Sequence, residues 1–215
     1  MLSPNMASSI IVIIFLMIIL SFLGARVAKM DPAKPIKGPI FLVIMLIDML
    51  NNLIKNYFGD NWKKFAPMLI GILLYLGFAN TVSLFGLATP LSNINIALGF
   101  SLMAFLIIQV SAIIAHNPLG RLKDLMSPIP FLFPLNIIGE ISTTTAMGLR
   151  LFGNILSGAV IGVIVMNILP TLVAIIPMTF IVHPIFNIGF GLIQAFVYFM
   201  LLMIFLSIAV ETEEV

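Results

Sequence analysis

The fold is decided by a long, almost uncharged stretch, residues 134–168, which reads PLNIIGEISTTTAMGLRLFGNILSGAVIGVIVMNI. Its charged side chains are Glu140 and Arg150 alone. A helix needs about 20 mostly apolar residues to cross a bilayer, and a longer apolar helix fits by tilting. The stretch therefore predicts a strongly tilted membrane-spanning helix.

The composition of the whole chain agrees with this prediction. Hydrophobic residues make up 61% of the 215 residues and charged residues only 8%, whereas a soluble domain is roughly 25% charged. A membrane β-barrel would show short alternating segments instead of continuous apolar runs. No long polar linker divides the sequence. We therefore expect an all-α integral membrane protein with a single membrane domain, residues 1–215.

Apolar runs of spanning length recur along the chain. They predict five membrane-crossing helices, and the last two exceed the required length and should both be strongly tilted. Residues 40–57 are different, because polar side chains interrupt them at helical spacing, which is typical of an amphipathic helix lying in the interface. The five expected crossings are residues 7–25, 65–87, 94–115, 134–168 and 172–210.

The loop charges predict the orientation. The first 25 residues carry no side-chain charge, and basic residues follow them, so this span is expected to be retained with its N-terminus outside. The C-terminus is then cytoplasmic, and every loop lysine and arginine faces the cytoplasm, as the positive-inside rule requires. These loop residues are Arg26, Lys29, Lys34, Lys37, Lys55, Lys63, Lys64, Arg121 and Lys123.

Several function classes lack support in the sequence. It has no cysteine, no HExxH motif, no carboxylate cluster, no P-loop and no dinucleotide fingerprint, so we expect no metal and no cofactor. The net charge of +2 is spread thinly between apolar runs, which argues against nucleic-acid binding.

Arg150 is the most informative residue. Burying a cation at a helix centre costs about 2.5–3.5 kcal/mol on insertion scales, and snorkelling suits residues near helix ends. Glu140 lies ten residues earlier, about 15 Å along a helix axis, which is too far for a direct pair. We therefore interpret Arg150 as functional.

The neighbours of Arg150 form a mostly small or polar stripe, so another helix can approach it closely. At about 100° per residue, the stripe contains Thr143, Ala146, Arg150, Asn154, Ser157 and Ile161. The glycines at 153, 158 and 162 include a small-xxx-small pair, which we attribute to ordinary helix packing.

The last helix carries a second polar stripe, consisting of His183, Asn187, Gln194 and Tyr198. These residues lie within about 60° of one another on a helical wheel. Two interpretations remain open: hydrogen bonds between helices, or the wall of an aqueous path. His183 is able to titrate near neutral pH.

The sequence resembles a known family at several of these residues. The stretch MGLRLFGN (147–154) resembles the signature of subunit a of bacterial F-type ATP synthases, in which the arginine is essential, and IQAF (193–196) matches the last-helix motif of that family. The segments 127–130, 134–140 and 89–95 are also similar. The resemblance covers about residues 40–210.

The resemblance implies a stator subunit that forms two offset proton half-channels against a ring of c subunits. Arg150 would favour the ionised form of each passing c-subunit carboxylate and block direct leak between the half-channels. Protons would enter from outside past His183, Asn187 and Gln194 of the last helix. They would leave past Glu140 to the cytoplasm. The implied path residues are His183, Asn187, Gln194, Tyr198, Asn154, Ser157 and Glu140.

The resemblance also implies partners and a location. The partners are the c-ring, the peripheral stalk of subunit b, the remaining synthase subunits and the lipid bilayer. The location is the bacterial plasma membrane, and the ATP chemistry would belong to other subunits, so this chain would not itself be an enzyme.

The chain departs from the family at two positions. Many relatives carry Glu or His where this chain has Ala159, and His, Glu or Ser where it has Asn187. The alternative function is a self-contained secondary transporter that binds an anionic substrate with Arg150 and Glu140. Such folds usually contain internal repeats, and this sequence shows none.

Overall fold

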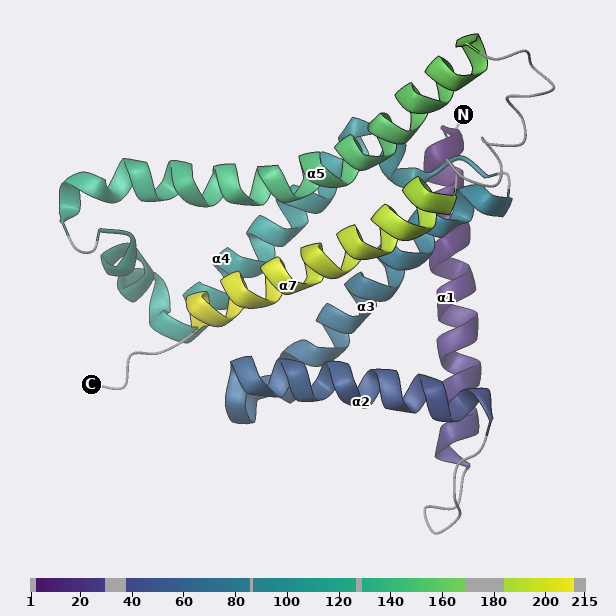
Figure 1. The fold of residues 1–215 in the computed structure, drawn as a ribbon. Coiled ribbons are helices and arrows are strands. Elements are labelled where there is room, and N and C mark those ends of the chain that lie inside the picture. Colours follow the sequence, from purple (N-terminus) through teal and green to yellow (C-terminus); the bar gives the residue numbers. More distant parts are fainter. Residues whose placement is uncertain (1–2, 30–37, 86, 127–128, 169–183, 211–215) are drawn as a thin grey trace.

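The computed structural model describes residues 3–29, 38–85, 87–126, 129–168 and 184–210. Within these ranges all the secondary structure is helical, as predicted (Figure 1). A π-helix, Pro184–Phe190, leads directly into the last α-helix. The long helices are α1 (Pro4–Ala28), α2 (Pro39–Phe58), α3 (Trp62–Thr81), α4 (Ile94–Met126), α5 (Phe133–Ile168) and α7 (Gly191–Val210).

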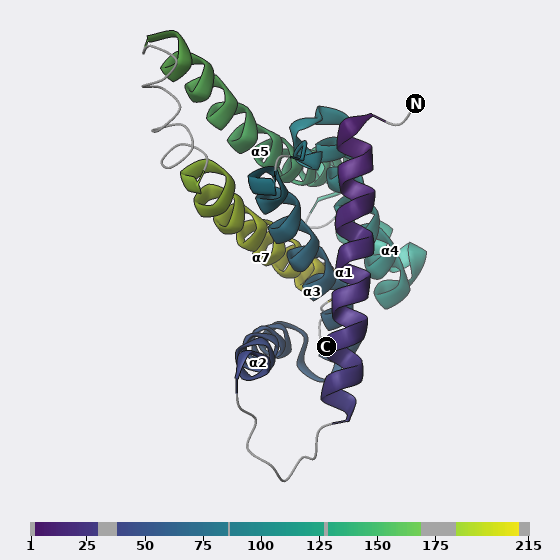
Figure 2. The ribbon, with the colours of Figure 1, turned by 90° about the vertical axis from the view of Figure 1, so that its right-hand side faces the viewer.

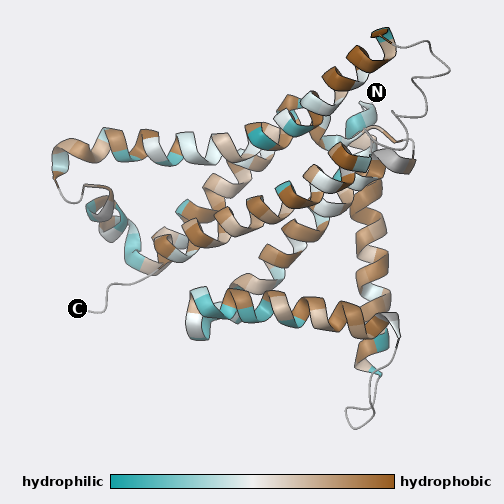
Figure 3. Cartoon of the chain, in the orientation of Figure 1, coloured by the Kyte–Doolittle hydropathy of each residue, from teal (hydrophilic) through white to brown (hydrophobic). Residues whose placement is uncertain are grey.

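Five helical segments of the described chain are long and apolar enough to cross a membrane. Apolar residues run along most of their length (Figure 3). The large exposed side chains, such as Ile18 at 64% exposure and Leu42 at 66%, need an apolar surrounding, which a bilayer provides. The five segments are Pro4–Ala28, Ile40–Thr81, Ile94–Lys123, Pro130–Ile168 and Pro184–Val210.

The amphipathic helix predicted at residues 40–57 is α2. It lies roughly perpendicular to α1 in two orthogonal views, at the end of the molecule where α1 finishes (Figures 1 and 2). One narrow face of α2, which contains Leu50 and Ile54, is buried, whereas Asp48 and Lys55 are exposed. Glycines with positive φ, Gly38 and Gly59, flank it. That conformation strains residues with a Cβ, so both ends of α2 are turns that require glycine.

The end of the third predicted span needs correction. We expected the helix to end at His116–Pro118 and a loop to follow, but α4 continues to Met126 across a break at Asn117, where φ is 61° and ψ is 158°. Pro118 explains the break, because proline has no N–H to donate and pushes the preceding residue out of the helical region. The chain then resumes as a helix that carries Arg121.

One other predicted span has different boundaries, and the start of the last span lies outside the described residues. The second span was expected over 65–87, but α3 begins at Trp62, ends at Thr81 and passes into a 3-10 turn, Val82–Phe85. The last span was expected from residue 172, and residues 172–183 lie outside the described ranges.

The last helix, α7, is the most deeply packed of the described helices. It contacts α3, α4 and α5, and both α5 and α7 run obliquely to α1 (Figures 1 and 2). The core of the bundle is therefore built around one face of α7. The fully buried side chains of that face are Tyr198, Phe199, Leu202, Met203 and Leu206.

A glycine sets the distance between α4 and α5. A Cβ built on Gly148 would lie 1.9 Å from Ser101 Oγ and 2.4 Å from the carbonyl oxygen of Ala97. No side chain fits at that distance, so Gly148 allows α5 to approach the backbone of α4. The same contact fixes the position of Arg150, two residues further along α5.

Candidate functional site

Arg150 lies near the middle of α5 (Phe133–Ile168). Its side chain is exposed, and it forms no hydrogen bond or ion pair with any residue in the described ranges. A guanidinium group stays protonated at every accessible pH. The structure therefore presents a permanent cation at the surface of an apolar helix.

The small and polar stripe around Arg150 is also open. Thr143, Ala146, Ser157 and Ile161 are exposed, and Asn154 is half-buried. The Ser157 hydroxyl donates to the carbonyl oxygen of Gly153, four residues back, at 2.8 Å. This face of α5 is thus left uncovered by the described part of the chain.

One contact joins the two polar stripes. Asn154 Nδ2 donates a hydrogen bond of 3.3 Å to Gln194 Oε1, and Gln194 is only 6% exposed. The other end of this amide, Nε2, has no hydrogen-bond partner among the described residues. A buried amide without a partner is expensive, so this nitrogen calls for a partner, protein or water, beyond the described residues.

The remaining residues of the second stripe are placed differently. Tyr198 is completely buried, and its hydroxyl donates to the carbonyl oxygen of Phe100 at 2.8 Å. Asn187 belongs to the π-helix Pro184–Phe190, and His183 lies outside the described residues. The structure therefore brings Gln194, but not Tyr198, into hydrogen-bonding contact with the Arg150 helix.

Glu140 has partners that the sequence did not reveal. As expected, it does not pair with Arg150. It forms an ion pair with Arg121, with Oε1 2.6 Å from Nη2, and its Oε2 accepts from Gln109 Nε2 at 2.5 Å. Sequence reasoning treated Arg121 as an ordinary loop cation and overlooked Gln109. The isolated amide of Gln109 in an apolar run was the one available signal.

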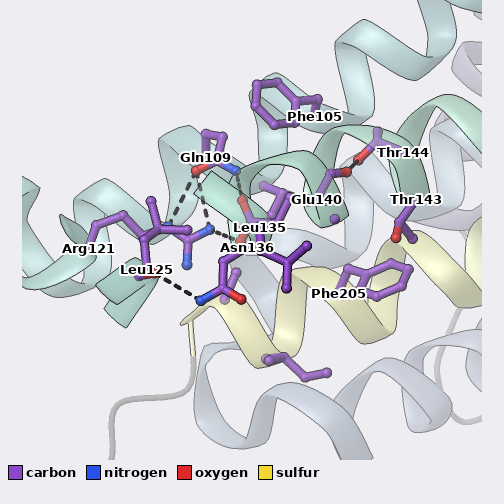
Figure 4. A pocket seen from close by; sticks show the side chains of 14 residues that line it. Phe105, Gln109, Arg121, Leu125, Leu135, Asn136, Glu140, Thr143, Thr144 and Phe205 are labelled. Atoms are coloured by element: carbon purple, nitrogen blue, oxygen red, sulfur yellow. Dashed lines mark hydrogen bonds and ion pairs between the residues drawn. The ribbon is translucent and has the colours of Figure 1, made fainter. Parts of the chain in front are cut away.

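This cluster lines a cavity of about 360 Å³. Its polar side chains come from α4 and α5, and those of Arg121, Gln109, Glu140 and Asn136 gather on one side of it (Figure 4). The end of α7 contributes uncharged side chains to the lining. Its lining includes Gln109, Arg121, Asn136, Glu140, Thr143 and Phe205.

The cavity and Arg150 share one face of α5. Thr143 lines the cavity and also belongs to the stripe that contains Arg150. The two residues are seven positions apart, which is about 10 Å along a helix. Two helical turns therefore separate the cavity from the exposed cation.

No group of three or more metal-binding side chains occurs within the described ranges. The polar groups of the described site are amides, hydroxyls, the Arg150 guanidinium group and the Arg121–Glu140 ion pair.

Comparison with known proteins identifies the family. A model of the family described as ATP synthase A chain matches residues 6–207. ATP synthase subunit a of Trichlorobacter lovleyi is 28% identical over 204 residues, which cover 93% of this chain and 84% of the relative. ATP synthase subunit a of Bacillus pumilus is 29% identical over an alignment of 231 residues, which covers 96% of this chain and 93% of the relative.

A third relative matches over a shorter length. ATP synthase subunit a 1 of Chlorobaculum parvum is 28% identical over 153 residues, which are 71% of this chain and 65% of that protein. The chain thus spans slightly less than two thirds of this relative. Because the family model matches nearly all of the sequence, the chain belongs to the ATP synthase A chain family.

Proposed function

We propose that this chain is the stator subunit a of a rotary F-type ATP synthase. In this role it conducts protons through two half-channels against a ring of c subunits and carries no ATP chemistry of its own. The observation that carries the proposal is Arg150, an exposed cation in the middle of an apolar helix without a partner among the described residues. Because such a charge is costly in a membrane, it calls for an anionic partner from another chain.

A carboxylate of the c-ring has the right chemistry to be that partner. At a separation of 4 Å and an effective dielectric constant of 20, opposite unit charges attract by about 4 kcal/mol. Arg150 therefore favours the ionised form of each carboxylate that passes, and the proton leaves. As the ring turns, the carboxylate moves away from Arg150 and regains a proton from the other half-channel.

The open stripe on α5 supports close passage of the ring. Ala146 and Ser157 are small and exposed on the same face as Arg150. Small residues allow two helix backbones to approach closely in a membrane. A c-subunit helix lying along this stripe would bring its carboxylate within reach of the guanidinium group.

The cavity at Glu140 supports an exit half-channel. Polar side chains line it, and Thr143 connects it to the Arg150 face. In the proposed orientation, with the N-terminus outside and the C-terminus cytoplasmic, this cavity opens to the cytoplasm. Protons released beside Arg150 would leave through it.

The entry half-channel is proposed along the polar stripe of α7 and the segment before it. His183, Asn187 and Gln194 would line it, with Asn154 and Ser157 facing them from α5. The unpartnered Nε2 of Gln194 supports a wet site, because a polar group within a membrane must find protein or water. Tyr198 would support this wall from behind, since its side chain is fully buried and its hydroxyl is bonded to the Phe100 carbonyl.

Several protons must pass for each ATP made. One charge that crosses 100 mV releases about 2.3 kcal/mol, so the work is accumulated by rotation and used on other subunits. The proposed partners are the c-ring, the peripheral stalk of subunit b and the remaining subunits of the complex. The proposed location is a bacterial plasma membrane.

Proton leak across vesicles that contain the whole complex tests the role of Arg150. If its charge separates the two half-channels, Arg150→Gln raises the leak under an imposed potential, with normal amounts of assembled complex. A leak equal to that of wild type argues against the proposal. The exit path has its own test, because unchanged coupling in Glu140→Gln vesicles would remove Glu140 from it.

A further inference from the structure

Three side chains form a closed polar cluster at the cavity. Gln109 comes from α4 before its break, Arg121 from α4 after the break, and Glu140 from α5. Gln109 Oε1 accepts from Arg121 Nε at 3.3 Å and from Nη2 at 3.2 Å, while Gln109 Nε2 donates to Glu140 Oε2 at 2.5 Å. Arg121 Nη2 also donates to Glu140 Oε1 at 2.6 Å. Each of the three side chains thus contacts the other two (Figure 4).

The break in α4 makes this cluster possible. Gln109 and Arg121 are twelve residues apart, which is about 18 Å along a straight helix. The non-helical Asn117 and the following Pro118 redirect the chain, so that Arg121 returns toward Gln109 and reaches Glu140. The ion pair is partly enclosed, because the side chain of Arg121 is 12% exposed and that of Glu140 is 32% exposed.

Both oxygens of the Glu140 carboxylate already accept an N–H donor. A carboxylate without its proton accepts hydrogen bonds only, so both oxygens suit the N–H donors that bind them. Arg121 also fixes the amide of Gln109, since the guanidinium group occupies its oxygen and turns its nitrogen toward Glu140. In the cavity, α7 adds Phe205, Ile208 and Ala209, which carry no charge.

We propose that Arg121 is a positioning residue of the proton exit: together with Gln109 it holds the Glu140 carboxylate as a fixed anion in the cavity wall. Protons then pass on water in the cavity, beside this held carboxylate, without residing on Glu140. The inference rests on the proposed function. A cavity of about 360 Å³ holds several water molecules, and Thr143 and Asn136 supply further polar groups in its lining.

A double-mutant cycle tests the proposal by ATP-driven proton pumping in vesicles with the whole complex, normalised to assembled subunit a. Arg121→Gln is expected to lower pumping roughly fivefold, within the range found for coupled charged pairs. The double variant Arg121→Gln/Glu140→Gln should pump no worse than Glu140→Gln alone, because Arg121 acts through Glu140. Arg121→Lys keeps the charge and should restore most of the activity. Additive losses in the double variant, or full activity in Arg121→Gln, would overturn the proposal.

The pH profile separates positioning from a merely structural role. In Arg121→Gln the carboxylate loses a donor that fixes its position, so pumping should fall more steeply than in the wild type as the pH is lowered from 8 to 6. The double variant lacks this carboxylate and should keep the profile of the wild type. A profile of Arg121→Gln parallel to that of wild type contradicts the proposal.

Matched variants keep the test decisive. Lys123→Gln removes an exposed cation from the same helical segment and should leave pumping and its pH profile unchanged. If Arg121→Gln does not assemble, Gln109→Leu is the alternative variant, because it removes the second donor to Glu140 and leaves the ion pair. Its pumping should also fall more steeply than that of the wild type as the pH is lowered, but by less than in Arg121→Gln. An unchanged profile in Gln109→Leu then overturns the proposal. Pumping by Arg150→Ala in the same vesicles would refute the proposed function itself, whatever the result for Arg121.

Discussion

The side-chain amide of Asn154 on α5 donates a hydrogen bond of 3.3 Å to the side-chain oxygen of Gln194 on α7. Asn154 follows Arg150 by one helical turn, so this bond links the helix of the cation to the most deeply packed helix of the bundle. It also fixes the orientation of the Gln194 amide, and leaves its Nε2 without a partner among the described residues. The Gln194 oxygen therefore has a structural role, while the Gln194 nitrogen is a donor without a partner among the described residues.

Replacing Gln194 separates these two roles. Gln194→Leu leaves Asn154 without its acceptor and should destabilise the assembled subunit by about 1–3 kcal/mol, with a large loss of pumping. Asn154→Leu/Gln194→Leu removes both polar partners and should regain much of the stability, while pumping stays low. Thermal dissociation of the purified complex and dye quenching in vesicles measure the two effects. Recovery of pumping in the double variant would mean that the pair only holds the helices together.

Tyr198→Phe tests whether the tyrosine hydroxyl carries protons. The ring packing is kept, and the hydrogen bond to the Phe100 carbonyl is lost, so stability should fall by about 0.5–1.5 kcal/mol. Because the hydroxyl is bonded to the backbone, we expect pumping to stay close to the wild-type rate. Pumping abolished in an intact Tyr198→Phe complex would instead make the hydroxyl part of the proton relay.

Gly148→Ala should disturb the packing of α5 on α4. The new methyl group would lie 2.4 Å from the Ala97 carbonyl oxygen, which is backbone and cannot move aside cheaply. Overpacking of this kind costs about 1–3 kcal/mol or more, so less assembled complex is expected on immunoblots. Gly99→Ala on α4 is the control, since a Cβ there meets nothing within 4 Å.

Ser101→Ala combined with Gly148→Ala sharpens this prediction. The added change removes the nearer clash, with Ser101 Oγ, and leaves the backbone clash. Assembly should therefore recover only in part. Full recovery would show that the serine side chain, and not the approach of the two backbones, sets the need for glycine at position 148.

Much of the fold follows from patterns that depend on single residues and their spacing. Lengths of apolar runs predicted the spans, and the polar side chains at helical spacing predicted α2, because solvent preference acts on each residue separately. The break at Pro118 was visible as a helix end. The restart beyond it was not, because the direction taken after a proline depends on tertiary packing.

The candidate site was less predictable for the same reason. Arg150 is conspicuous as a lone cation in an apolar run, and Gln194 stands out in the polar stripe of the last helix, which the resemblance also marks. The partners of Glu140 depend on how α4 bends at Asn117, and the partner of Tyr198 is a backbone carbonyl. Every non-proline residue carries such a carbonyl and N–H, so no residue type in the sequence marks the one that Tyr198 binds.

ATP-driven quenching of a pH-sensitive dye in vesicles, comparing wild type with Arg150→Ala, decides whether this cation drives proton transport. We expect pumping to be lost while the complex remains assembled at wild-type levels, because nothing then drives the c-ring carboxylates into their ionised form. Normal pumping by an assembled Arg150→Ala complex would contradict the role given to this cation, and with it the proposed function.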